Sequence, residues 1–100
     1  MIRSFANTET EKLFRRERVR KLPPDMQRTA LRKLVQLDAV LTLDDLRVPP
    51  GNRLEALSGD RVGQHSMRIP NIAELKGDQW RVCFAWTAGG AEGVEIVDYH

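Results

Sequence analysis

The sequence predicts an α+β domain, in which helices from the first half pack on one face of a mainly antiparallel sheet from the second half. Hydrophobic residues recur every three or four positions up to about residue 41, which is typical of helices. After residue 52 they alternate with a period of two, which is typical of strands. Turn signals rich in Gly, Asp and Pro separate these strand-like segments, so we expect hairpins and a twisted sheet of four to five strands.

The helical half opens with residues 2–5, whose apolar ends give only a weak strand signal. Thr8 and Glu11 then have the spacing of a capping box, with the Thr8 hydroxyl accepting the backbone N–H of Glu11. A first helix should begin there, carry Leu13 and Phe14 inward, and end before the prolines at 23–24, because proline has no N–H for a helix interior.

A second helix over 25–41 is the clearest element. Its apolar stripe repeats at spacings of three and four, and the residues concerned are Met26, Ala30, Leu34, Leu37 and Leu41, widened by Leu31 and Val35. Residues 42–46 can add one short helical turn before the Pro-Pro-Gly-Asn sequence at 49–52 forces a loop.

Four strands are expected in the second half, over residues 53–57, 64–69, 79–86 and 94–97. The third is the strongest, because its alternation is complete. One face carries Trp80, Val82, Phe84 and Trp86, and the other carries Gln79, Arg81, Cys83 and Ala85. Cys83 is the only cysteine, so it cannot form an internal disulfide, and we interpret it as a core residue and not as a reactive thiol.

The composition indicates one soluble domain over residues 1–100, because a chain of 100 residues with 41% hydrophobic residues has room for a single core. It has no run of about eighteen apolar residues and no apolar signal peptide, so we expect no membrane contact and a cytoplasmic location. The net charge of +2 is unevenly distributed. Residues 1–50 carry 11 basic and 7 acidic residues, whereas residues 51–100 carry 5 and 7. A basic helix surface can face ribosomal RNA or an acidic partner, or simply be solvated.

Four sequence blocks stand in an order that is typical of one protein family. They are GNRLEALSGDR at 51–61, GQHS at 63–66, DQWRVCF at 78–84 and VEIVDYH at 94–100. Together with MIRSF at 1–5 and LDA at 37–39 they cover nearly the whole chain. The sequence thus resembles the HigB-type toxins of the RelE/ParE superfamily, most closely the branch that includes the GraT toxin.

The resemblance implies a RelE-like fold whose sheet presents a concave face to mRNA. It also implies a ribosome-dependent endoribonuclease, the toxin of a type II toxin–antitoxin system, which cuts mRNA in the A site without metal or cofactor. In such a reaction the ribose 2′-hydroxyl attacks the neighbouring phosphate, so the protein must supply a base, an acid and a cation.

Arg81 fits the cation role, because the Trp-Arg pair of the family places it on the strand face opposite Trp80. Tyr99 and His100 follow an apolar strand at the end of the sequence, and the resemblance gives them a part in catalysis or substrate binding. Further RNA contacts are expected from four residues, which are Arg53, Arg61, Arg68 and Asp98.

Glu55 stands where many HigB proteins have a histidine, and Ser58 stands where they have a lysine. A carboxylate can act as the general base, although it is ordinarily weaker than imidazole, so we expect slow cleavage or mild toxicity. Alternatively His65 or His100 takes this role. His65 shares a predicted face with Met67 and Ile69, which favours a core histidine whose hydrogen bonds are satisfied.

The connection at 70–77 is longer than in the usual family member, and we interpret it as a neutral insertion or a loop that reaches a partner. The expected partners are a HigA-like helix-turn-helix antitoxin, the ribosome with its mRNA and, through the antitoxin, operator DNA. Two alternatives from other classes remain: a ParE-like inhibitor that binds DNA gyrase without catalysis, and a small interaction domain without toxicity.

Overall fold

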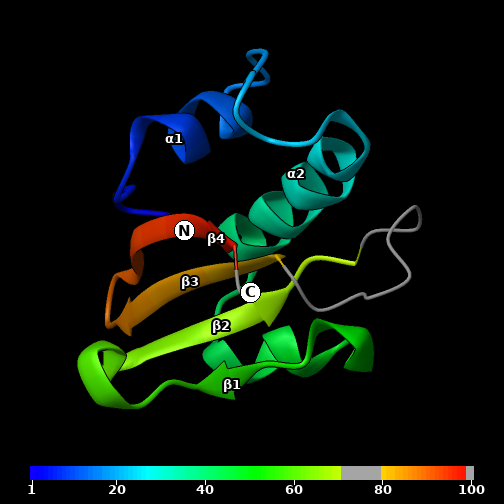
Figure 1. The fold of residues 1–100 in the computed structure, drawn as a ribbon. Helices are drawn as coiled ribbons and strands as arrows, with labels where there is room; N and C mark the ends of the chain where they lie inside the picture. Colours follow the sequence, from blue (N-terminus) through cyan, green and yellow to red (C-terminus); the bar gives the residue numbers. More distant parts are fainter. Residues whose placement is uncertain (71–79, 99–100) are drawn as a thin grey trace.

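Two α-helices lie on one face of a four-stranded sheet in the computed structural model, which describes residues 1–70 and 80–98 (Figure 1). The α-helices are α1 (Thr8–Phe14) and α2 (Pro24–Ala39). The strands are β1 (Glu55–Ala56), β2 (Gln64–Arg68), β3 (Trp80–Thr87) and β4 (Gly90–Asp98). Short 3₁₀ helices connect them, namely η1 (Leu43–Arg47), η2 (Pro50–Asn52) and η3 (Gly59–Arg61). This arrangement confirms the predicted α+β class.

Helix α1 is shorter than expected and has a different cap. Asn7, not Thr8, is the N-cap, and its side-chain oxygen accepts the backbone N–H of Thr10 at 2.9 Å. The predicted capping box at Thr8 is therefore wrong: the cap lies one residue earlier, at Asn7, and asparagine caps a helix as well as threonine does. The helix ends at Phe14, and Arg16 adopts a positive φ of 64°. The chain from residue 15 to the prolines consequently forms a loop.

Helix α2 confirms most of the predicted stripe. Met26, Ala30, Leu34 and Leu37 are fully buried against the sheet. Leu41 is 90% exposed, because the helix ends at Ala39 and Val40 turns extended before the next helical position is reached. Val35, at 41% exposure, lies at the solvent edge of the stripe. Among the described residues no helix is long and apolar enough to cross a membrane.

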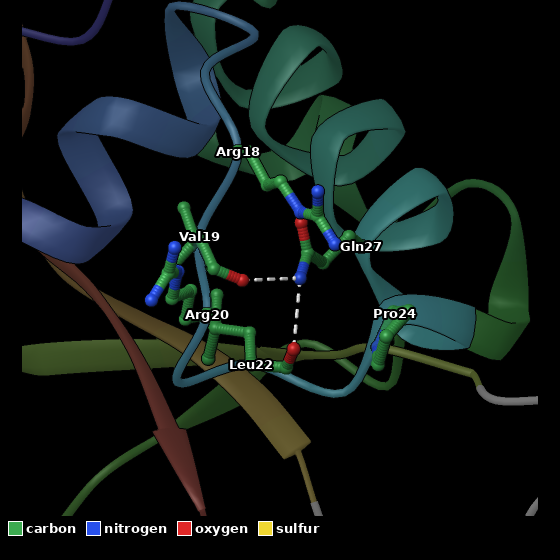
Figure 2. Close-up of a pocket in the computed structure, with 6 residues that line it drawn as sticks. All are labelled: Arg18, Val19, Arg20, Leu22, Pro24 and Gln27. Atoms are coloured by element: carbon green, nitrogen blue, oxygen red, sulfur yellow. Dashed lines mark hydrogen bonds between the residues drawn. The ribbon is translucent and has the colours of Figure 1, made fainter.

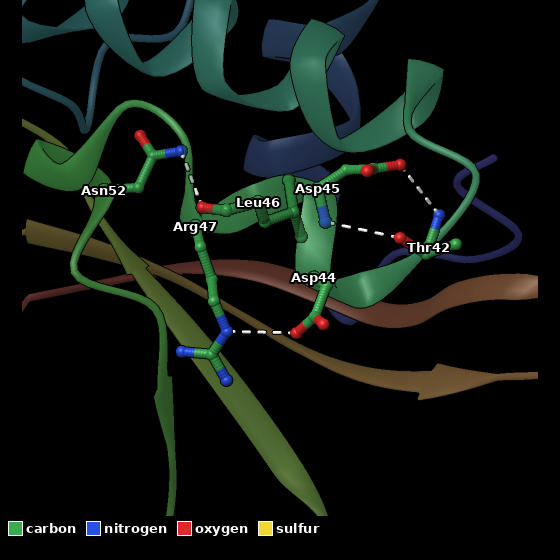
Figure 3. Close-up of polar contacts among 6 residues, drawn as sticks. All are labelled: Thr42, Asp44, Asp45, Leu46, Arg47 and Asn52. Carbon is green, nitrogen blue, oxygen red and sulfur yellow. Dashed lines mark hydrogen bonds and ion pairs between the residues drawn. The ribbon is translucent and has the colours of Figure 1, made fainter.

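The predicted turn after α2 is present as η1, and it carries the capping box that α1 lacks. Thr42 Oγ1 accepts the Asp45 N–H, and the Asp45 carboxylate accepts the Thr42 N–H (Figure 3). Asn52, fully buried at the end of η2, donates through Nδ2 to the Leu46 carbonyl at 3.0 Å and accepts from Lys33 Nζ. Burial lowers the pKa of Lys33 below its ordinary value. This polar cluster ties the connection to α2.

The strands follow the order β1-β2-β3-β4, and every neighbouring pair is antiparallel. The register shifts between β3 and β4, since Cys83 pairs with Glu95 but Ala85 pairs with Glu92. Gly93, with a φ of +61°, lies in the extra length of β4 and adopts the left-handed conformation that a bulge requires. The bulge brings Ala91 and Val94, both fully buried, onto the same face of the sheet.

The weak strand predicted at residues 2–5 forms two isolated parallel bridges to β4, Ile2 to Ala91 and Phe5 to Val94. The edge of β4 is thereby covered by the start of the chain. Farther along, the hydroxyl of the buried Thr10 accepts the Ile96 N–H at 3.0 Å. A covered edge is protected from pairing with another chain, and among the described residues the edge of β1 has no such cover.

Candidate active site

The two faces of the sheet differ in character, and the register assigns each strand residue to one of them. The core face carries Met67, Val82, Phe84, Val94 and Ile96, which pack with α2 in one hydrophobic cluster. Directly paired residues share a face. The opposite face, called the outer face below, therefore has three rows of paired residues, which are Gln64, Ala85 and Glu92; Glu55, Ser66, Cys83 and Glu95; and Arg68, Arg81 and Val97.

Arg81 is the best-defined polar group of the outer face. Although it is an arginine, it is only 7% exposed. Its Nη1 donates to Ser66 Oγ at 2.8 Å, and its Nη2 donates to Glu55 Oε1 at 3.3 Å. The guanidinium is thus held across β2 in one orientation. A preorganised, partly desolvated cation is what a phosphorane-like transition state needs, because no reorganisation is required when charge develops.

Glu55 lies within hydrogen-bonding reach of Arg81, as the choice of these two residues for one site requires. The carboxylate is 56% exposed, whereas the arginine side chain is 9% exposed, so the ion pair joins a solvated acid to an enclosed cation. This asymmetry leaves a Glu55 oxygen accessible to solvent and to a ligand. The pair therefore brings a candidate base and a candidate cation together at the β1 edge of the outer face.

Ser66 was missed by sequence reasoning. It is fully buried in β2, and its hydroxyl accepts a hydrogen bond from Nη1 of Arg81 at 2.8 Å. Alternation along the second strand places Ser66 on the face opposite Met67, which was a usable signal. The contact itself depends on the pairing of β2 with β3, which alternation within one strand cannot supply.

A second ion pair crosses the outer face. Arg61 Nη1 donates to Gln64 Oε1 at 3.0 Å and to Glu95 Oε1 at 2.8 Å, so this side chain reaches from η3 to β4. Glu95 was also missed by sequence reasoning, because its face depends on the bulge at Gly93. Glutamates consequently pair with both Arg61 and Arg81, so an anionic ligand would have to compete with these carboxylates.

The other residues expected to bind RNA are placed differently. Arg68 is half-buried and pairs directly with Arg81, so both belong to the outer face. Arg53 is exposed in a left-handed conformation (φ 45°) just before β1. Asp98 pairs with Trp80 and alternates with Ile96, which assigns it to the core-face side of the sheet. The structure thus places Arg68 beside Arg81 on the outer face and places Asp98 on the other face.

The histidines divide into one that the structure places and one that lies outside the described residues. The His65 ring stacks on Phe84 at 6.2 Å between centroids, which confirms its position on the core face. The expectation of satisfied hydrogen bonds is wrong, however, because its buried Nδ1 has no hydrogen-bond partner within the part of the chain that the structure describes. His65 lies on the core face and Arg81 on the outer face, so His65 cannot act as the general base at the Arg81 site. Tyr99, His100 and most of the 70–77 insertion lie outside the described residues.

Cys83 is fully buried, as expected, but on the outer face between Ser66 and Glu95, away from the hydrophobic cluster. Within residues 1–70 and 80–98, no three His, Cys, Asp or Glu side chains are grouped so that they could hold a metal ion. The arrangement offers a fixed guanidinium, a solvated carboxylate beside it and a second arginine opposite. These groups can bind a phosphodiester and stabilise negative charge on it.

Comparison with known proteins identifies the family of this chain. Residues 3–100 match the family described as RelE-like toxin of type II toxin-antitoxin system HigB. Toxin HigB-1 of Vibrio cholerae serotype O1 is 39% identical over 75 residues, which cover 75% of this chain and 72% of that protein. These matches are to the family and do not test the branch within it. The chain belongs to the HigB-like toxins, the RelE-like toxins of type II toxin–antitoxin systems.

Proposed function

We propose that residues 1–100 form a single toxin domain that cuts mRNA in the ribosomal A site by a metal-independent reaction. The observation that carries this proposal is the buried Arg81, oriented by Ser66 and Glu55 on the outer face. Burial of a guanidinium is costly unless the group is paired, and this one is paired with a solvated carboxylate that a ligand can reach. Family membership supports a toxin that acts on RNA.

In the proposed reaction a general base removes the proton of the ribose 2′-hydroxyl, and the 2′-oxygen forms a bond to the adjacent phosphorus. The bond from phosphorus to the 5′-oxygen breaks, and a general acid protonates that leaving oxygen. The products are a 2′,3′-cyclic phosphate and a 5′-hydroxyl end. Arg81 stabilises the charge on the phosphorane, where a positioned donor typically contributes about 2.7–4 kcal/mol.

Glu55 is the proposed base, because its exposed carboxylate lies beside the cation that binds the phosphate. Tyr99 and His100 are proposed to supply the acid and a stacking or phosphate contact. The described end of β4 supports this assignment, since Val97 pairs directly with Arg81. Arg53, Arg61, Arg68 and Asp98 remain proposed RNA contacts.

The experiment that tests this function is primer-extension mapping of transcripts after induction of the toxin. Wild type should give new 5′ ends inside codons of translated messages, whereas Arg81→Ala and a chain that lacks His100 should not. Equal cleavage by Arg81→Ala and wild type, with both folded, would refute the assignment. Induction of a DNA-damage response without mRNA cleavage would instead support a ParE-like gyrase inhibitor, which the HigB match does not favour.

Membership in a type II toxin family implies an antitoxin partner. The proposed partner is a HigA-like helix-turn-helix protein, which would also link the toxin to operator DNA, and the proposed place of action is the ribosome in the cytoplasm. Coexpression with the product of the adjacent gene tests the pairing. Growth should recover, and the two proteins should copurify.

A further inference from the structure

The helical layer carries a basic surface that the candidate active site does not use. It consists of six exposed residues, Arg16, Arg18, Arg20, Lys21, Arg28 and Arg32, which are called the basic surface below. Residues 15–32 contain seven basic and two acidic side chains, although the whole chain has a net charge of only +2. The positive charge of the protein is therefore concentrated between α1 and the first half of α2.

The loop over residues 15–23 carries four of these six residues, and contacts with the rest of the protein hold it in place. Val19 and Leu22 are buried at 5% and 7% exposure and anchor the loop from below. Gln27 Nε2 donates to the carbonyls of Val19 and Leu22 at 2.7 and 2.8 Å, which fixes the loop against α2 (Figure 2). Arg18 and Arg20 flank the anchored Val19 and line a cavity of about 350 Å³. Their backbone positions are consequently fixed, so little backbone freedom is lost on binding.

The basic surface also lacks the internal neutralisation of the outer face. Among the described residues, the structure gives none of its six side chains an ion pair, whereas Arg81 contacts Glu55 and Arg61 contacts Glu95. Arg15, the next basic residue along the chain, does have a partner in Glu11. An incoming polyanion meets uncompensated positive charge on the helical layer, and it meets ion pairs on the sheet.

These two surfaces lie on opposite sides of the molecule. The residues of α2 that face the sheet are Met26, Ala30, Leu34 and Leu37, and all are fully buried. Arg28 and Arg32 are exposed on the same helix and thus project away from the core. Figure 1 shows α1 and the loop between the α-helices farther from β1 than α2 is. One RNA strand on the outer face would not cover the basic surface at the same time.

The composition of the surface favours nucleic acid over protein as the partner. The described large hydrophobic residues that are strongly exposed are Met1, Val35, Leu41, Val48 and Val62, and none of them lies between residues 15 and 32. The centre of a protein–protein interface is depleted in charge and enriched in apolar side chains. Interfaces with nucleic acid are polar and strongly positive, and arginine suits phosphate because it can donate two parallel hydrogen bonds.

We propose that the basic surface is a second RNA-binding surface, which grips the phosphate backbone of structured RNA while the outer face takes the strand to be cut. This inference rests on the proposed function only where it assigns the strand that is cut to the outer face. Its contacts are sequence-independent, so it sets how tightly the protein docks on an RNA assembly and leaves the chemical step unchanged.

The test compares two double variants that remove the same charge. Arg18→Gln/Arg20→Gln changes the basic surface, and Arg15→Gln/Arg47→Gln changes two exposed arginines that are paired with Glu11 and Asp44. Binding to an RNA duplex of about 16 base pairs is measured as a function of salt concentration. Each lost phosphate contact lowers the slope of log K against log salt by about 0.9, so the first variant should lose nearly two units.

We expect the affinity of Arg18→Gln/Arg20→Gln to fall on the order of tenfold at low salt and that of the control to change little. Equal losses in both variants, or none, would overturn the proposal. Polyglutamate serves as a second probe, an acidic polypeptide. If Arg18→Gln/Arg20→Gln lost binding to polyglutamate but kept its binding to RNA, the proposal would also be overturned, and an acidic protein partner would be indicated. If Arg18→Gln/Arg20→Gln, called the loop variant below, has a much lower melting temperature than wild type, Arg28→Gln/Arg32→Gln on α2 gives the same test with the loop unchanged.

Cleavage of mRNA on purified ribosomes separates this proposal from the proposed function. The loop variant should need more ribosomes for half-maximal cleavage and reach the wild-type rate at saturation, whereas Arg81→Ala should bind the duplex normally and cleave slowly. Wild type that binds the duplex but cuts no mRNA would refute the function and leave the surface standing.

Discussion

Replacement of Arg81 by alanine tests the candidate active site most directly, because the structure predicts separate effects on rate and on stability. The guanidinium is the cation assigned to the phosphorane, so its loss should lower the single-turnover cleavage rate by about 10²–10³-fold. Arg81→Lys should fall between wild type and alanine, since an ammonium keeps the charge but cannot reproduce the planar fork that contacts both Ser66 and Glu55.

The stability effect follows from what each partner of Arg81 loses. The Ser66 hydroxyl is fully buried, and leaving it without its partner costs about 1–3 kcal/mol. Glu55 is 56% exposed and regains water, so its carboxylate adds little to this cost. The sum stays below the roughly 3–5 kcal/mol expected when an enclosed charge loses its partner. For a domain of this size, the melting temperature should fall by about 4–20 °C.

Single-turnover cleavage of mRNA on ribosomes gives the rate, and thermal unfolding followed by circular dichroism gives the stability. Arg47→Ala is the matched control, because Arg47 is exposed and pairs with Asp44 on the surface. It should change neither quantity measurably. Arg81→Ala that is folded and cleaves at nearly the wild-type rate would show that the reaction does not need this cation.

Four further predictions concern groups around or beyond Arg81. Ser66→Ala should reduce the cleavage rate at saturating ribosomes, and Ser66→Thr, which keeps the hydroxyl, should restore it; equal rates in both variants would count against a positioning role. Glu55→Gln should lower the single-turnover cleavage rate, because an amide cannot take the proton of the 2′-hydroxyl, whereas an unchanged rate would leave Glu55 only a partner of Arg81. Deletion of His100 should relieve growth arrest in cells, and toxicity that survives would exclude that residue from the reaction. Because burial lowers the pKa of Lys33 in the folded state, the unfolded state binds more protons at alkaline pH. The free energy of unfolding should therefore rise with pH between the lowered pKa and 10.5, relative to Lys33→Gln, in urea titrations; parallel curves would contradict the assigned burial cost.

Much of the fold could be predicted from the sequence, because it depends on local periodicity. The stripe from Met26 to Leu37 and the alternation from Trp80 to Trp86 place helices and strands correctly without knowledge of their partners. The choice of Arg81 and Glu55 for one site also came from sequence alone, through the resemblance to a family. The structure brings these two side chains together at 3.3 Å.

Only the tertiary structure decided which residues of neighbouring strands lie beside one another and what each side chain contacts. The partnership of Ser66 with Arg81 and that of Glu95 with Arg61 depend on strand register and on the bulge at Gly93. Alternation places His65 on the core face, but only the structure shows that its Nδ1 has no hydrogen-bond partner among the described residues. The physical reason is range: propensity and alternation act over a few residues, whereas register is set by pairing between strands that are distant in the sequence.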